Sequence, residues 1–225
     1  MLWKRRPDAS DLDAYRRLRQ VLSDVHNQHA IRRIPRGLLI RVARDLRMLR
    51  GTREILLDDE DEVGFHIDRC IYDLRPDGRT IMEQLGEDAA LSPEERQVAA
   101  AAAGSQYYSL FEIVGADPER GRVELHDLLG DRDTSITDLA FSRTADDQAG
   151  AMIATRVLEL DGVAMTSGVA CPFVAEQRMG LLASLRPRRQ GKRRVTVARD
   201  AYSAFFFRRY KRADLTHIGF VAPSP

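Results

Sequence analysis

Residues 105–141, SQYYSLFEIVGADPERGRVELHDLLGDRDTSITDLAF, decide the fold of this chain because their hydrophobic pattern has the period of a β-strand. β-branched and aromatic residues alternate with polar ones between turn residues, and residues 150–173, GAMIATRVLELDGVAMTSGVACPF, continue the pattern. The pattern predicts a meander of about five or six short strands. The expected strands begin near Tyr107, Gly121, Thr134, Ala151 and Val163. We expect the meander to close into a small SH3-like or OB-like β-barrel over residues 105–185, because closure removes the sheet edges. A helix at 175–185 is expected to cap this barrel.

Residues 1–53 are predicted to form an arginine-rich helical hairpin. After Ser10, which can cap a helix, apolar residues recur every three or four positions: Leu12, Tyr15, Leu18, Leu22 and Val25. Pro35 and Gly37 interrupt the pattern, and a second helix is expected from about Gly37 to Arg50. Its apolar face consists of Leu39, Val42, Leu46 and Leu49, and its opposite face of Arg41, Arg44, Arg47 and Arg50. The arginines form either a solvated helix face or a surface for phosphate or an acidic partner.

Residues 54–104 are predicted to be an acidic lead-in to the barrel. The five consecutive acids at 58–62 favour a solvated loop, or pairing with arginines, over a metal site, because neighbouring side chains in a run diverge. FHIDRCIYDL, at 65–74, is predicted to be a strand that ends at the turn RPDG. SPEE, at 92–95, predicts the start of an alanine-rich helix that continues to Gly104.

Residues 186–225 are predicted to be a basic C-terminal arm. RPRRQGKRR has too few apolar residues to bury itself, which indicates a flexible linker or an exposed loop. A short helix follows, with an aromatic stripe of Tyr202, Phe205, Phe206 and Tyr210. We expect the stripe to dock on the barrel, with stacking on single-stranded nucleic acid and contact with a membrane surface as alternatives. Together these segments predict an α+β protein.

Four stretches of the chain resemble a group of bacterial proteins of unknown function, many of which end in the cysteine-rich SEC-C zinc motif. The stretches are FHIDRCIYDLRPDGRTIMEQL, LSPEER, YYSLFEIVGADPERGRVELHDLLG and GAMIATRVLELDGVAMTSG, within about residues 65–173. The resemblance implies a helical lead-in, then a small β-barrel with an Asp-Leu-Leu turn at Asp127, Leu128 and Leu129. Zinc binding does not carry over, because no cysteine follows Cys171.

The sequence favours a protein without catalytic activity, metal or cofactor. It contains no GxSxG, HExxH or GxxxxGK[ST] motif, and its cysteines, Cys70 and Cys171, form no CxxC pair. His26 and His29 lie one helical turn apart but lack a third ligand at a recognisable spacing. Asp68 and Asp73 would face opposite sides of the predicted strand. With no apolar run long enough for a membrane helix or a signal peptide, we expect a cytoplasmic location and no membrane partner.

The distribution of charge leads to the functional prediction. The net charge is only +1, but basic ends flank an acidic middle. All but three of the 35 basic residues are arginine, a bias that a GC-rich genome also produces. We predict a non-enzymatic binding protein whose basic arms contact RNA, DNA or another polyanion. The alternative is a protein-interaction adaptor or a subunit of a larger assembly. The predicted polyanion-binding residues are Arg188, Arg189, Lys192, Arg193, Arg194, Arg208, Arg209, Arg41, Arg44 and Arg47.

Overall fold

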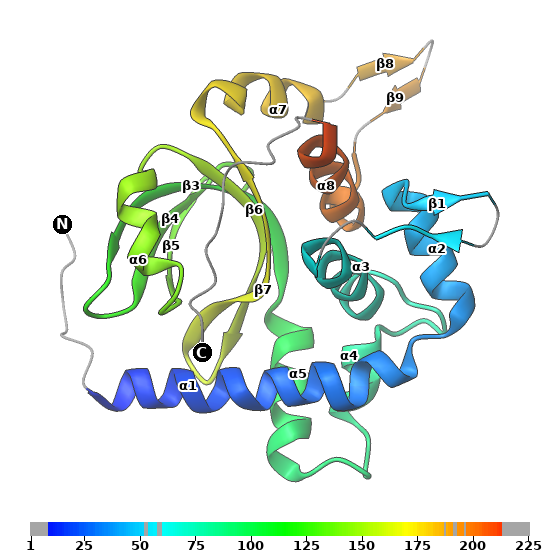
Figure 1. Ribbon diagram of the computed structural model, residues 1–225, viewed down its shortest axis with the longest axis vertical. Coiled ribbons are helices and arrows are strands. Elements are labelled where there is room, and N and C mark those ends of the chain that lie inside the picture. Colours follow the sequence, from blue (N-terminus) through cyan, green and yellow to red (C-terminus); the bar gives the residue numbers. More distant parts are fainter. Residues whose placement is uncertain are drawn as a thin grey trace.

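The computed structural model describes residues 9–51, 54–57, 60–186, 188–190, 193–195 and 197–212. The protein has an α+β fold in which helices surround one curled antiparallel sheet (Figure 1). The sheet has five strands in the order β5-β4-β3-β6-β7. No helix in the described ranges has the length and apolar character that crossing a membrane requires.

The five strands of the sheet start where the period-two pattern predicts. They are β3 (Tyr107–Asp117), β4 (Arg122–Asp127), β5 (Arg132–Thr137), β6 (Met152–Leu160) and β7 (Val163–Phe173). Asp161 and Gly162, both with positive φ (47° and 79°), form the two-residue turn between β6 and β7. Two positive φ values give the turn the twist that a tight antiparallel hairpin needs.

The prediction of a closed barrel is wrong. The edge strands β5 and β7 approach each other, but the register in the described residues contains no pairing between them. The curled sheet buries its inner face without closing, because Ile153 and Val157 of β6 lie in one apolar cluster with residues of β3, β4, β5 and α6 (Ser142–Ala145). Helix α5 (Pro93–Ser105) also packs on β6. The short edge strand β5 begins with exposed Arg132 and Asp133, and charged side chains protect a sheet edge from further pairing.

The two predicted N-terminal helices are present, but the first packs mainly on α5 and the second mainly on α3 (Glu60–Tyr72). Helix α1 (Ala9–Asp24) continues through a π-helical turn, η1 (Val25–Ala30), and a 3₁₀ turn, η2 (Ile31–Arg33), and α2 (Arg36–Leu46) follows. Helix α2 ends earlier than predicted because Arg47 adopts a left-handed conformation (φ 66°). Residues 49–50, predicted to be helical, form strand β1 (Leu49–Arg50), which pairs with β2 (Glu54–Ile55).

The predicted strand at 65–74 is also wrong, because most of this segment belongs to helix α3 (Glu60–Tyr72). The buried side of α3 includes Glu62, Phe65, Arg69 and Tyr72, at spacings of three and four residues. This is a helical period, but half of the positions that define it are charged. A search for apolar residues at helical spacing therefore does not detect helix α3. The acids at 60–62 lie in the first turn of α3, where they complement the helix dipole.

The remaining helices complete the core. They are α4 (Ile81–Gly86), α5 (Pro93–Ser105), α6 (Ser142–Ala145), η3 (Asp146–Gln148), η4 (Ala175–Gln177), α7 (Arg178–Leu185), η5 (Arg199–Ala201) and α8 (Tyr202–Arg212). The helices predicted from SPEE and at 175–185 are confirmed, and a capping box of Ser92 and Glu95 starts α5. Helices α3 and α8 lie between the sheet and α2 (Figure 1).

The C-terminal arm contains more regular structure than predicted. β8 (Arg188–Gln190) pairs with β9 (Arg193–Val195) in the segment where a flexible linker or an exposed loop was expected. The aromatic stripe of α8 packs on the core, as the leading interpretation expected. Phe206 is completely buried and contacts the rings of Tyr108 and Phe173, and Phe207 contacts Phe65.

Candidate functional site

Arg156 is the most unusual residue of the core. It is a charged side chain in the middle of β6, and only 1% of its surface is exposed. The pairing of β6 with β7 shifts register at this residue, between Thr155 and Val157. Such irregularities change the direction of a side chain and occur often beside functional sites. The guanidinium lies 4.7 Å from the ring centre of Tyr72 and 5.5 Å from that of Tyr108.

Three side chains accept hydrogen bonds from Arg156. Its Nε and Nη2 donate to Asp68 Oδ2 at 3.1 and 2.9 Å, Nη2 also donates to Asp73 Oδ1 at 2.7 Å, and Nη1 donates to Gln106 Oε1. Burial by itself disfavours the charged guanidinium, but the carboxylates of Asp68 and Asp73 outweigh it and raise the pKa of Arg156. The residue is therefore a permanently charged group inside the core.

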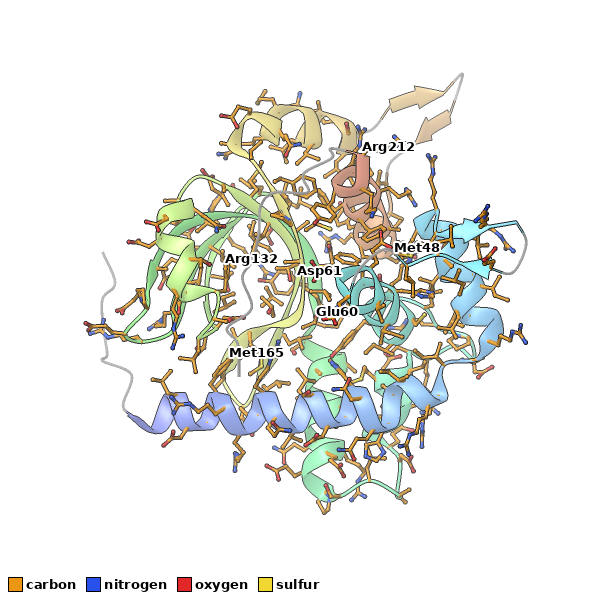
Figure 2. The ribbon with its side chains drawn as sticks, viewed as in Figure 1. Met48, Glu60, Asp61, Arg132, Met165 and Arg212 are labelled. Atoms are coloured by element: carbon orange, nitrogen blue, oxygen red, sulfur yellow. The ribbon has the colours of Figure 1, made fainter. Side chains whose placement is uncertain are left out.

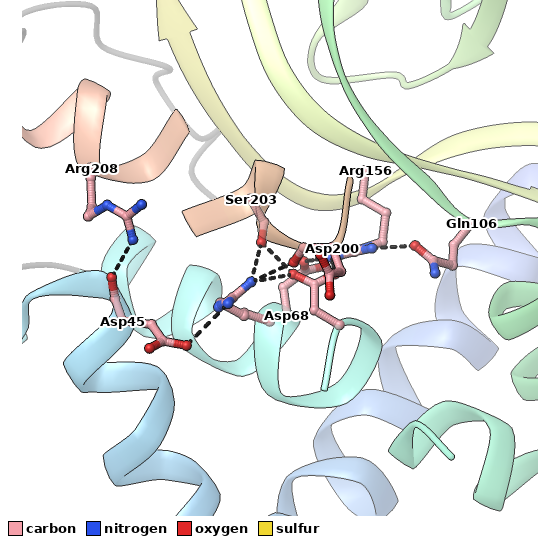
Figure 3. A network of polar contacts seen from close by, with 9 residues as sticks. Asp45, Asp68, Gln106, Arg156, Asp200, Ser203 and Arg208 are labelled. Carbon is pink, nitrogen blue, oxygen red and sulfur yellow. Dashed lines mark hydrogen bonds and ion pairs between the residues drawn. The ribbon is translucent and has the colours of Figure 1, made fainter. Parts of the chain in front are cut away.

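A second buried arginine, Arg69 of α3, extends this network to α2 and α8. Its Nη1 donates to Asp73 Oδ2 at 3.1 Å and to Ser203 Oγ at 2.9 Å, and its Nη2 donates to Asp45 Oδ2 at 3.2 Å. Ser203 in turn donates to Asp73. Figure 3 shows this chain of polar contacts running from Arg208 and Asp45 through Ser203 to Arg156 and Gln106. The network joins α2, α3, α8 and the sheet around one set of charges.

The network corrects the expectation for Asp68 and Asp73. They do not face opposite sides of a strand, because Asp68 lies on α3 and Asp73 directly after it, and both bind Arg156. No motif or local charge pattern in the sequence singles out Arg156. The sequence feature that could have identified it is an arginine in the middle of the mostly apolar strand MIATRVLEL, for which Asp68 and Asp73 are possible ion-pair partners.

A cavity of about 540 Å³ lies against the network. Its lining is rich in tyrosine and arginine: Tyr72, Tyr107, Tyr108, Tyr202, Arg75, Arg132, Arg156 and Arg199. Asp73, Gln106, Ser109, Asp127, Leu129, Gly130 and Asp200 complete it. We call it the tyrosine cavity.

Asp127, the first residue of the Asp-Leu-Leu turn, has a structural role at the wall of the tyrosine cavity. Its Oδ1 accepts hydrogen bonds from the backbone N–H groups of Leu129 (3.0 Å) and Gly130 (2.9 Å), and from Ser109. These contacts fix the turn between β4 and β5. Arg132, which follows the turn, is held over the ring of Tyr107 at 4.1 Å.

A second hollow, of about 320 Å³, lies where α2 and β1 meet the end of α8. Four basic residues line it: Arg47, Arg208, Lys211 and Arg212. Leu46, Met48, Leu49, Leu56, Glu62 and Phe207 form the rest of its lining. Figure 2 labels Met48, just before β1, and Arg212, the last residue of α8, and both line this hollow. We call it the basic hollow.

The basic hollow brings together only some of the predicted polyanion-binding residues. Arg47 and Arg208 line it, whereas Arg41 and Arg44 are exposed on α2 outside it. Arg209 instead donates to Ser184 Oγ of α7 at 3.0 Å. The hairpin residues Arg188, Arg189, Arg193 and Arg194 are placed by their backbone alone, and Lys192 lies outside the described residues.

The two histidines considered as a metal pair have separate partners. His26 Nε2 lies 2.8 Å from the Tyr72 hydroxyl, and His29 Nε2 lies 3.2 Å from Glu95 Oε1. Burial, followed by the charges of Arg19 and Arg156, lowers the pKa of His26 to about 3. His26 is therefore a neutral, half-buried residue at neutral pH. No group of three or more metal-ligating side chains occurs in the part of the chain that the structure describes.

Comparison with known proteins gives a family without a known activity. No curated protein and no solved structure matches the chain. A family match covers residues 9–218, which extends on both sides of the stretches at 65–173 that carry the sequence resemblance. The match includes both the tyrosine cavity and the basic hollow. The chain belongs to this family, which is described as a family of unknown function, DUF7986.

Proposed function

We propose that this protein is a non-enzymatic binding protein that holds nucleic acid, or another polyanion, at the basic hollow. One observation carries the proposal. Arg47 at the end of α2 and Arg208 and Arg212 of α8 converge on one hollow from segments far apart in the sequence. None of these three guanidiniums forms an ion pair with a carboxylate in the described ranges, whereas Lys211 pairs with the buried Glu62.

The direction of the pKa shift of Arg208 supports binding of an anion in the basic hollow. Partial burial, and then the positive charges of Arg47 and Arg69, lower the pKa of Arg208, and Arg212 acts in the same direction. A phosphate between these groups would reverse that effect, because an opposite charge favours the charged form of each arginine. Guanidinium groups also bind phosphate oxygens with paired hydrogen bonds.

Interaction with the C-terminus of α2 accounts for the position of Arg208 but not for those of Arg47 and Arg212. Arg208 Nη1 donates to the carbonyl oxygen of Asp45 at 2.6 Å, near the C-terminus of α2, where a cation complements the helix dipole. Arg47 and Arg212 are exposed and make no such contact among the described residues. Their donors are available to a ligand from solvent.

Salt dependence tests the proposal. Binding of a fluorescent single-stranded oligonucleotide is titrated at several salt concentrations for the parent protein and for the Arg47→Ser/Arg212→Ser variant. Each lost phosphate contact lowers the slope of log affinity against log salt by about 0.7 for a single strand. Arg32→Ser/Arg36→Ser is the matched control, since Arg32 in η2 and Arg36 at the start of α2 are both exposed and lie outside the basic hollow.

Two results would contradict the proposal. If the parent protein does not bind single- or double-stranded probes at low salt, nucleic acid is not the ligand and the adaptor function takes its place. If both variants change the slope equally, the effect comes from net charge and not from the basic hollow.

A further inference from the structure

The tyrosine cavity lies at the opposite end of α8 from the basic hollow. Tyr202, the first residue of α8, lines the cavity, and Arg212, the last, lines the hollow. Ten residues of helix separate the two by about 15 Å. With a volume of about 540 Å³, the cavity has the size that small-molecule sites have in proteins.

The charged groups at the floor of the tyrosine cavity are already paired. Arg156 donates hydrogen bonds to Asp68, Asp73 and Gln106, and the two carboxylates balance its charge. Because an arginine has no acceptor, Gln106 must turn its amide oxygen toward Arg156. Its amide nitrogen has no hydrogen-bond partner among the described residues. The floor therefore presents a fixed donor and no free positive charge.

The rim of the cavity supplies positive charge that is only partly used. Arg199 is exposed and forms no ion pair in the described part of the chain, and Arg132 has one long contact, from its Nε to Asp127 Oδ2 at 3.5 Å. The carboxylate of Asp127 already accepts hydrogen bonds from the backbone N–H groups of Leu129 and Gly130 in its own turn. Arg75 is paired with Glu83, and Asp200 is the exposed carboxylate of the rim.

Aromatic walls stand beside these guanidiniums. The ring of Tyr107 already carries the guanidinium of Arg132 on one face, which shows that a flat group fits against it. Tyr202 lines the cavity from α8, and its ring packs edge-on against Phe206 at a centroid separation of 6.3 Å. Flat rings stack favourably on tyrosine faces and on guanidinium planes.

We propose that the tyrosine cavity binds a small molecule that combines a flat ring with one carboxylate or phosphate group. The ring lies among the tyrosines and accepts a hydrogen bond from the Gln106 amide. The anionic group lies at the rim between Arg132 and Arg199. This site is separate from the basic hollow and does not depend on polyanion binding.

Calorimetric titration of the intact protein, in a buffer without phosphate, tests the site with four probes. Adenosine monophosphate and benzoate carry both a ring and a charge, inorganic phosphate carries only the charge, and adenosine carries only the ring. We expect at least one of the first two to bind with a dissociation constant below about 1 mM, and at least about tenfold more tightly than inorganic phosphate or adenosine. If neither ring-bearing anion binds, or if inorganic phosphate binds as tightly to the Arg47→Ser/Arg212→Ser variant, whose basic hollow has lost two arginines, the proposal is wrong.

Variants separate this site from the basic hollow. Arg132→Gln/Arg199→Gln should weaken binding of the ring-bearing anion by about tenfold or more, and Tyr107→Leu should weaken it without changing the charge of the rim. Arg47→Ser/Arg212→Ser should leave it unchanged. Circular dichroism melts confirm that each variant is folded. Unchanged binding in the folded Arg132→Gln/Arg199→Gln variant would exclude this cavity as the site. The outcome is independent of whether oligonucleotides bind at the basic hollow.

Discussion

Arg156 of β6 and Asp68 of α3, 88 positions apart in the chain, form an ion pair of 2.9 Å in which 1% and 5% of the two side chains are exposed. The pair connects the sheet to the helix that separates it from α2 (Figure 1). A buried pair of this kind contributes little net stability relative to apolar residues, but leaving one partner alone is costly. It therefore constrains the position of α3 against the sheet more than it strengthens the packing.

The first prediction is that Arg156→Met destabilises the protein severely. The change leaves Asp68 and Asp73 buried without their partner, and the free energy of unfolding should fall by about 3–5 kcal/mol. Urea unfolding followed by circular dichroism measures it. The control is Arg122→Met, because Arg122 is a partly exposed arginine on the neighbouring part of the sheet. A loss below about 1 kcal/mol for Arg156→Met, equal to the control, would show that the network is not important for stability.

The second prediction concerns the docking of α8. Ser203 is 1% exposed, donates to Asp73 and accepts from Arg69, so Ser203→Ala leaves a buried donor and a buried acceptor without this partner. We expect a loss of about 1–3 kcal/mol in the free energy of unfolding and faster amide hydrogen exchange in α8. Ser23→Ala, at an exposed contact with Asn27, is the control. Unchanged exchange in α8 would mean that its aromatic residues alone hold it in place.

The sequence predicts the sheet well and the network poorly, and the reason is physical. The starts of β3, β4, β5, β6 and β7 follow from local alternation and turn residues, which are short-range properties. Closure of the sheet is not a local property, because it depends on pairing between the edge strands β5 and β7, which are not neighbours in the sequence. The helical face of α3 includes Glu62, His66, Asp68 and Arg69, whose burial becomes favourable only through partners elsewhere in the chain.

The same contrast between local patterns and long-range contacts applies to the two candidate sites. The sequence identified Arg47 and Arg208 as candidates from local charge, and the structure brings them to one hollow. No local pattern indicates the tyrosine cavity, whose lining comes from α3, β3, β4, the turn after β4, β5, β6, η5 and the start of α8. Residues that are ordinary in their local context form a cavity only when the fold assembles them.

The third prediction is a pH dependence that arises from His26. Burial lowers the pKa of His26 to about 3, below its ordinary value of 6.5, so the unfolded chain binds a proton more readily than the folded one. The stability from neutral His26 is therefore fully present above pH 6.5 and is lost as the pH falls toward 3. Between pH 7 and 5 the loss should be about 2 kcal/mol in the free energy of unfolding.

Urea unfolding at pH 7 and at pH 5 measures this effect against two variants. His26→Gln keeps a neutral hydrogen-bonding group beside Tyr72 and removes the titration, so its stability should fall less over this range than that of the parent protein. His29→Gln, on the half-buried histidine beside Glu95, should behave like the parent. An equal fall in the parent and in His26→Gln would mean that another group controls the acid sensitivity.

The last prediction concerns the β8–β9 hairpin, whose register sets Arg188 opposite Val195, Arg189 opposite Arg194 and Gln190 opposite Arg193. If this hairpin contributes to polyanion binding, replacing Arg188, Arg189, Lys192, Arg193 and Arg194 with serine should reduce the salt slope by about 0.9 for each duplex phosphate that loses its contact. Preference among base sequences should stay the same, because phosphate contacts position a protein and base edges specify the sequence.

Combining the hairpin variant with Arg47→Ser/Arg212→Ser tests whether the hairpin and the basic hollow bind one polyanion. If they contact different phosphates of the same strand, the reductions in slope add, because each phosphate releases its counterions independently. If the hairpin variant retains the parent slope while Arg47→Ser/Arg212→Ser reduces it, binding is confined to the basic hollow. If the reverse holds, the hairpin carries the contact and the proposal for the basic hollow fails.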